Sequence, residues 1–136
     1  GIVYAVMTSL GFATLENVMY VVFSNSDTPY IWIYRAALSV PAHMLFAVTM
    51  GYYFSLAKFA PDARTKRSYM LKSLFVPVIL HGTYDLIVMS NMSLLLLALI
   101  PFMIYLWVSN LKKLNHYYKE SKRESLLTPV PSDLEE

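Results

Sequence analysis

The sequence predicts an all-α membrane protein, a polytopic bundle of four transmembrane helices. Hydrophobic residues make up 57% of the 136 residues and charged residues 15%, whereas an average soluble domain has roughly half and one quarter. The apolar residues gather in four runs, and each run approaches or exceeds the roughly 20 residues that cross a bilayer. The length leaves room for a single membrane core, 1–111, followed by a charged cytoplasmic tail, 112–136.

The first three predicted helices follow the apolar runs. The first covers 1–23 and ends at the polar stretch 24–29, whose Ser, Asn, Asp and Pro residues favour a turn. The second covers 30–59 and carries aromatic residues near both ends, as helices do at membrane interfaces. A connector, 60–69, is too polar for the hydrocarbon, and the third helix, 70–90, follows it.

The fourth predicted helix, 93–111, begins directly after a short turn, so it must lie antiparallel to the third. Its run 94–99 has no ionisable group and predicts a lipid-facing or supporting span. The tail is expected to extend this helix and then to become disordered, given its charged composition. Because the chain opens with Gly1 in an apolar run, without a charged segment or cleavage site, we expect a fragment of a longer protein.

Lysine and arginine define a predicted topology. Five lie between Lys58 and Lys72, five lie in the tail, and only Arg35 remains. The positive-inside rule therefore places the 60–69 connector and the C-terminus of this multi-pass membrane protein in the cytoplasm. These basic residues flank apolar spans, so they favour the lipid bilayer as a partner and no nucleic acid. With no cysteine, disulfides and thiolate metal sites are excluded.

Four ionisable residues lie inside the predicted spans: Glu16, His43, His81 and Asp85. Each costs on the order of 2.5 to 3.5 kcal/mol to insert, so each calls for a function or a partner. With a rise of about 1.5 Å per residue, the first three lie roughly 12 to 18 Å below the outer helix ends, and Asp85 lies one turn above His81. The four side chains are therefore expected in one layer, towards the extracytoplasmic side.

His81 and Asp85 are four residues apart, on one helical face, where the carboxylate can orient the imidazole or share a ligand with it. Pro77 precedes His81 by four residues, and Pro41 precedes His43 by two. Each proline leaves a helical carbonyl without its usual donor. Such breaks are tolerated where the backbone faces protein or a wet cavity, which favours a cavity beside both histidines.

Each of these residues also has a structural interpretation. A single histidine in a span can serve as a hydrogen-bonding residue between helices, and Glu16 can pair with Arg35. The motifs HExxH, GxSxG and GxGD are absent from the sequence. Their absence excludes the corresponding zinc, serine and presenilin-type protease signatures.

Three short motifs occur in order on the first three predicted helices: GFATLEN at 11–17, RAALSVPAH at 35–43 and HGTYD at 81–85. Together they strongly resemble the PrsW family of bacterial intramembrane proteases, relatives of the CAAX-processing glutamate proteases and of bacteriocin-immunity-type membrane proteins. The resemblance covers roughly residues 1–90. It implies an endopeptidase that makes the site-1-type cut in a membrane-anchored anti-sigma factor or similar single-span substrate, outside the cytoplasm, within a regulated stress response.

The resemblance implies roles for the matching residues, without a metal or cofactor. In a glutamate-type protease a carboxylate takes a proton from the attacking water, so Glu16 is expected to be catalytic. His43 is expected to orient that water, and His81, held by Asp85, to donate a hydrogen bond to the developing oxyanion. Two supporting residues are expected beside them, Asn17 and Arg35.

One family motif is missing. The family carries EExxK on a helix before the GFAxxEN segment, and this sequence does not contain it. Two alternatives to the glutamate-type protease therefore stay open. One is a zinc-dependent membrane hydrolase in which His43, His81 and Asp85 bind Zn²⁺ and leave a fourth position open. The other is a non-catalytic substrate-binding fragment that lacks the catalytic glutamate motif.

Overall fold

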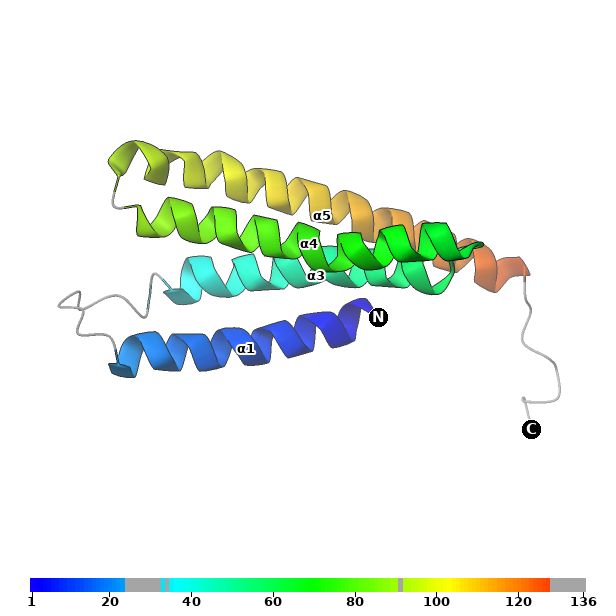
Figure 1. Cartoon of the computed structure of the whole chain (residues 1–136), viewed down its shortest axis with the longest axis horizontal. Helices are drawn as coiled ribbons and strands as arrows, with labels where there is room; N and C mark the ends of the chain where they lie inside the picture. The colour runs from blue at the N-terminus through cyan, green and yellow to red at the C-terminus, as the bar shows by residue number, and fades with distance from the viewer. Residues whose placement is uncertain (24–32, 34, 91, 128–136) are drawn as a thin grey trace.

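The computed structural model describes residues 1–23, 33, 35–90 and 92–127. Its elements are, in order, α1 (Ile2–Phe23), the π-helix η1 (Arg35–Ser39), α3 (Val40–Lys58), α4 (Ala63–Met89) and α5 (Ser93–Leu127). The four long helices lie side by side along the long axis of the molecule (Figure 1). The predicted all-α class with four long helices is confirmed.

The core of the bundle is built around α3. This helix packs against α1, α4 and α5, and most of the buried side chains of the described residues belong to it. By contrast, α1 buries only Ala13. In the described part of the chain, no Cα atom of α1 lies within 8 Å of α4 or α5. The position of α1 in the bundle therefore depends on α3 and on η1.

A glycine on α3 allows α1 to come close. A Cβ atom added at Gly51 would lie 2.7 Å from the Cα atom of Ile2 and 3.3 Å from the Cβ atom of Ala5. Small residues at helix interfaces in membranes permit this kind of close backbone approach. Gly51 and Ala5 therefore have a structural role at this crossing.

Three helices, α1, α4 and α5, are long and apolar enough to cross a membrane. The remaining predicted span, α3, is not among them, since polar groups such as His43 and Thr49 lower its hydropathy. Both of these side chains are buried, so α3 is covered largely by other helices rather than by lipid. Large apolar side chains are exposed on the surrounding helices, as a lipid environment requires.

Two helix boundaries differ from the predicted ones. Helix α4 begins at Ala63 rather than at residue 70, because the Asp62 carboxylate caps it by accepting a 2.9 Å hydrogen bond from the Thr65 backbone N–H. Most of the predicted polar connector is thus the first part of a helix. Helix α5 continues through residues 112–127 of the tail and ends at Leu127. The predicted turns at 24–29 and at Asn91, and residues 128–136, lie outside the described residues.

The predicted second helix, 30–59, contains a change of winding. Its first residues lie outside the described part, and Arg35–Ser39 then form a π-helix before α3 begins. Pro41 has no N–H and cannot complete the α-helical bond to the carbonyl of Ala37. Bonding to a residue five positions ahead is a local solution that often occurs at functional sites.

Candidate active site

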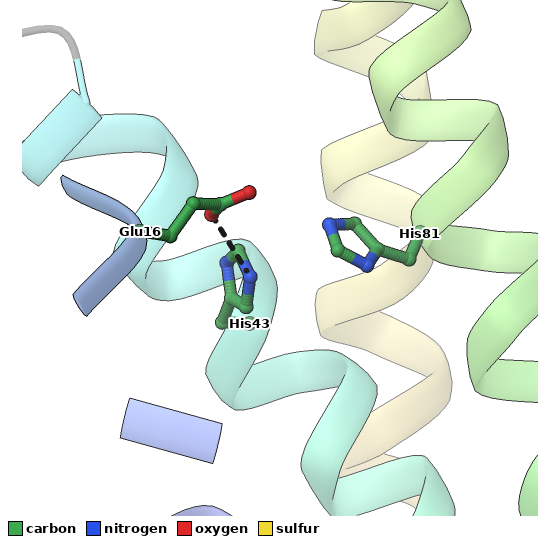
Figure 2. A group of neighbouring side chains, drawn as sticks. All are labelled: Glu16, His43 and His81. Atoms are coloured by element: carbon green, nitrogen blue, oxygen red, sulfur yellow. Dashed lines mark ion pairs between the residues drawn. The ribbon is translucent and has the colours of Figure 1, made fainter. Parts of the chain in front are cut away.

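Three ionisable side chains from three helices converge inside the bundle. Glu16 comes from α1, His43 from α3 and His81 from α4, and their ligating atoms all lie within 4.8 Å of one another. Figure 2 shows the carboxylate above the His43 ring, with one nitrogen of His81 pointing towards both. The structure thus brings together three of the four residues for which the sequence predicted a common layer.

The hydrogen bonding of His43 shows which ring nitrogen carries a proton. Its Nδ1 atom lies 2.8 Å from the carbonyl oxygen of Ser39, and a carbonyl can only accept, so Nδ1 is the donor. In a neutral ring, Nε2 then presents a lone pair. This nitrogen lies 3.3 Å from Oε2 of Glu16, which in an ionised carboxylate is also an acceptor.

Three buried atoms of the cluster have no hydrogen-bond partner among the described residues: Oε2 of Glu16, Nε2 of His43 and Nε2 of His81. An unsatisfied buried polar group costs about 1 to 3 kcal/mol, and more when it is charged. Acceptors that face one another without a hydrogen between them require a shared proton or a cation. A proton or cation between Glu16 Oε2 and His43 Nε2 would satisfy both acceptors, beside the positive charge that Arg35 already supplies to Glu16.

The donor set fits a divalent metal ion. Zn²⁺ binds imidazole nitrogen and carboxylate oxygen at about 2.0 to 2.2 Å, which places tetrahedral ligands about 3.4 Å apart. The distance of 3.3 Å between Glu16 and His43 already matches this spacing, and the ligand atom of His81 lies within 4.8 Å of both. A histidine ligand commonly donates its other N–H to a backbone carbonyl, as His43 does to Ser39.

Arg35 holds the outer side of this cluster. Its Nη2 atom lies 3.2 Å from Oε2 of Glu16, and its Nε donates a 2.8 Å hydrogen bond to Oδ1 of Asn17. The guanidinium carbon lies 3.9 Å from the centroid of the Tyr20 ring. The pairing of Glu16 with Arg35 that the sequence offered as a structural interpretation therefore coexists with the histidine cluster. Tyr20 has no counterpart among the predicted site residues.

Asp85 lies beside the cluster rather than in it. One carboxylate oxygen is 3.6 Å from Nε2 of His81, which is too long for a hydrogen bond. Its side chain is 43% exposed, and together with Glu16 and Arg35 it lines a cavity of about 270 Å³. The Asp85 carboxylate thus lies near Nε2 of His81, the nitrogen that also faces Glu16 and His43.

Aromatic rings enclose the two histidines. Their own ring centroids are 4.8 Å apart, and the Phe46 ring lies 6.2 Å from that of His43 and 5.3 Å from that of His81. Phe12 adds a ring at 5.8 Å from His43. The sequence analysis did not single out these phenylalanines, although Phe46 stands one helical turn after His43. Phe46 thus packs against both histidine rings, and Phe12 against that of His43.

A larger cavity, of about 770 Å³, extends from the histidines between α1 and α4. Its floor is α3, and both His43 and His81 belong to its wall. We call this cavity the α1–α4 groove. The residues that line it include Thr8, Phe12, Phe46, Met50, Lys58 and Val78. The cluster therefore separates two cavities, the groove on one side and the cavity beside Arg35 and Asp85 on the other.

Comparison with known proteins identifies the family of this chain. Residues 1–109 match the family described as PrsW family intramembrane metalloprotease. The chain belongs to the PrsW family. It is 42% identical to a protein named Protease PrsW from Clostridioides difficile, over 90% of this chain and 52% of that one. A protein of the same name from Bacillus subtilis is 42% identical over 83% of this chain and 50% of its own length.

A third relative extends the match. Protease PrsW of Geobacillus kaustophilus is 39% identical over 97% of this chain and 56% of its own length. The chain thus spans about half the length of the curated relatives it matches. No solved structure matches it. The family resemblance drawn from the three motifs is confirmed, and so is membership of a membrane protein family.

Proposed function

We propose that this chain is the membrane core of an intramembrane endopeptidase in which Glu16, His43 and His81 hold a divalent metal ion, with Zn²⁺ the expected one. The observation that carries the proposal is the convergence of three buried ligand atoms from three helices, none of which has a hydrogen bond among the described residues. The description of the matched family as a metalloprotease supports it. The ligand set differs from the zinc alternative of the sequence analysis, because Glu16 replaces Asp85.

The residues of this chain would divide the work. A bound Zn²⁺ would polarise the scissile carbonyl and activate water for attack. The Ser39 carbonyl fixes the tautomer and orientation of His43, and Arg35 holds Glu16 in place and balances its charge. Asp85, at the edge of the cluster, is placed to accept a proton from water that enters through the cavity it lines.

The proposed substrate is a membrane-anchored protein with one span, such as an anti-sigma factor whose cleavage starts a regulated stress response. The curated relatives are named proteases, which supports a protein substrate. The basic residues at 58–72 and in the tail support a cytoplasmic C-terminus in a bacterial cell membrane. With this topology the cluster lies in the outer part of the bilayer, and the cut falls outside the cytoplasm.

A glutamate-type mechanism without metal is the second candidate. It is favoured by the distance of 3.3 Å between Glu16 Oε2 and His43 Nε2, which a shared proton would satisfy. In that case Glu16 takes the proton of the attacking water. The two candidates use the same residues and differ in one measurable quantity, the metal content of the active protein.

The test measures metal and cleavage together. The chain is purified and reconstituted in liposomes with a single-span anti-sigma factor, and bound metal is quantified by mass spectrometry. We expect about one metal ion per chain and loss of both metal and cleavage in Glu16→Gln and His43→Ala. The matched controls are Glu120→Gln and His116→Ala, whose side chains are exposed on α5.

Chelation separates the candidates. Loss of cleavage on metal removal and its return with Zn²⁺ support the metal site. Full cleavage by a metal-free preparation contradicts it and leaves the glutamate-type reaction. Binding of the substrate with no cleavage under either condition would show the non-catalytic alternative.

A further inference from the structure

The α1–α4 groove lies where helices α1 and α4 do not pack against each other. In the described part of the chain, α1 and α4 share no Cα pair within 8 Å, and each is held against α3 instead. The groove between them is a cavity of about 770 Å³ with α3 as its floor. A membrane-spanning segment can therefore approach from the lipid between these two helices without displacing a helix contact.

The groove leads along α3 from the proposed reactive cluster. His43 marks one end of its floor and Lys58 the other, which at about 1.5 Å per residue corresponds to about 22 Å. That length covers the greater part of the hydrocarbon core, which is about 30 Å thick. With the C-terminal end of α3 towards the cytoplasm, the groove runs from the cluster to the cytoplasmic side.

The chemistry of the groove wall selects its occupant. No Asp or Glu is among the described residues that line it, and apart from the two histidines its one charged side chain is Lys58, at the far end. The wall between them consists mainly of aromatic and aliphatic side chains, among them Phe12, Phe46 and Met50. An uncharged apolar peptide is compatible with this surface, whereas a charged residue near its middle would be desolvated without a partner.

We infer that the α1–α4 groove binds the half of a substrate's membrane-spanning segment that lies between the scissile bond and the cytoplasm. The inference rests on the proposed function, because the histidines at the end of the groove define where the bond is cut. It adds a direction and a chemistry to the substrate. The apolar cytoplasmic half is held by protein, and the cut bond lies at its outer end.

Two matched pairs of substitutions test the groove from its opposite walls. Val78 lines the groove and is 56% exposed, whereas its neighbour Ile79 is 64% exposed and lies outside it. On α1, Thr8 lines the groove and Met7 does not. We expect Val78→Trp and Thr8→Trp to lower cleavage of the single-span substrate about tenfold or more, since an indole displaces the peptide from its position.

The controls isolate the groove from the cluster. Ile79→Trp and Met7→Trp should cleave within about twofold of the wild type, because surface substitutions of this kind have small effects. All four variants should bind as much metal as the wild type. Equal loss in both members of each pair, or no loss in Val78→Trp and Thr8→Trp, would overturn the inference.

A second measurement does not depend on cleavage. A photoreactive benzophenone side chain is placed at position 78 or 79 in the His81→Ala background, in vesicles that contain the substrate. We expect substrate adducts chiefly from position 78, on the cytoplasmic side of the scissile bond. Adducts chiefly with a second copy of the chain, or equally from both positions, would contradict the inference. If the protein with His81 intact cleaves no substrate and position 78 still captures it, the proposed reaction fails while the groove stands.

Discussion

Two polar clusters lie along α3, and they differ in whether their hydrogen bonds are complete. In the first, the buried Thr49 hydroxyl donates to Oδ1 of Asn110 at 2.9 Å, and Nδ2 of Asn110 donates to the Leu106 carbonyl at 2.8 Å. Lys113 donates to the Thr49 hydroxyl oxygen at 3.1 Å. This cluster joins α3 to α5, and each of its polar groups has a partner.

The second cluster, Glu16, His43 and His81, joins α3 to α1 and α4 but leaves three buried atoms without a hydrogen bond among the described residues. Both clusters place costly polar groups inside a membrane bundle. In a complete cluster, the hydrogen bonds between the polar groups offset that cost and fix the packing of the helices. An incomplete cluster is explained by something it must bind. Substitutions should therefore affect stability at the first and chemistry at the second.

The largest expected effect follows from His81→Leu, which removes one unpartnered atom and keeps an apolar side chain. Metal stoichiometry should fall below one ion for every ten chains, and cleavage should fall on the order of a thousandfold. The free energy of unfolding of the metal-free protein should change by less than about 1 kcal/mol, because the nitrogen has no hydrogen bond to lose. Denaturation in detergent, with and without chelator, measures the difference. A large loss of stability in the metal-free protein would make His81 a structural residue.

Arg35→Gln should give the next largest effect, because Arg35 pairs with Glu16 and donates a hydrogen bond to Asn17. Loss of a partner that orients a ligand typically weakens metal binding about 10- to 100-fold. Titration with a fluorescent zinc chelator measures the affinity, and Arg64→Gln, at an exposed position, is the control. Partial recovery in Arg35→Lys would show that charge matters beside geometry. Unchanged affinity in Arg35→Gln would remove Arg35 from the site.

Asn110→Ala should reverse the pattern. We expect a loss of about 1 to 2 kcal/mol in unfolding free energy, since Thr49 loses its acceptor and a void replaces a side chain that is 1% exposed. Metal content and cleavage per folded molecule should stay within about twofold of the wild type, as expected for a site far from the reaction. Asn115→Ala, an exposed change on the same helix, is the matched control. Loss of metal binding in Asn110→Ala would show that the clusters are coupled.

The smallest expected effect concerns Asp62, an exposed carboxylate that accepts hydrogen bonds from Thr65. Hydrogen bonds from the Thr65 side chain and backbone lower the pKa of the Asp62 carboxyl from its usual value of 3.8. A lowered folded-state pKa adds stability above the unfolded value, and this contribution is lost as the pH falls through the folded value. Asp62→Asn should keep the cap and remove this acid dependence, so melting temperatures at pH 7 should nearly coincide. A parallel fall of both proteins between pH 5 and pH 3 would contradict this assignment.

Depth along each helix could be predicted from the sequence, and lateral position could not. Counting residues from the apolar boundaries placed Glu16, His43 and His81 at similar depths, and the structure brings them together. The same count placed Asp85 in the layer, but its rotation about α4 leaves it at the edge, 43% exposed. Depth depends on hydropathy, which is local, whereas rotation depends on packing against neighbours that are distant in sequence.

Some features of the fold could not be predicted because they depend on contacts between residues distant in sequence. The run 94–99 predicted a lipid-facing or supporting span, and the polar contact of α5 with α3 comes later, at Asn110, within the same predicted helix. An asparagine near an expected helix end reads as an interfacial residue until its partner Thr49 is known. The π-helix before Pro41 was similarly signalled only as a missing donor. Its carbonyl at Ser39 turned out to orient His43.

The isolation of α1 from α4 has a mechanical consequence. Their backbones stay apart, yet Glu16 on one and His81 on the other supply ligands to the same proposed ion. An ion held there would link α1 to α4. Its binding free energy would be added to the stability of the arrangement in which the two helices are linked. Without the ion, α1 would be held only by its contacts with α3 and η1 among the described residues, so it could move relative to α4. The proposed metal would then also affect how readily the space between α1 and α4 admits a substrate.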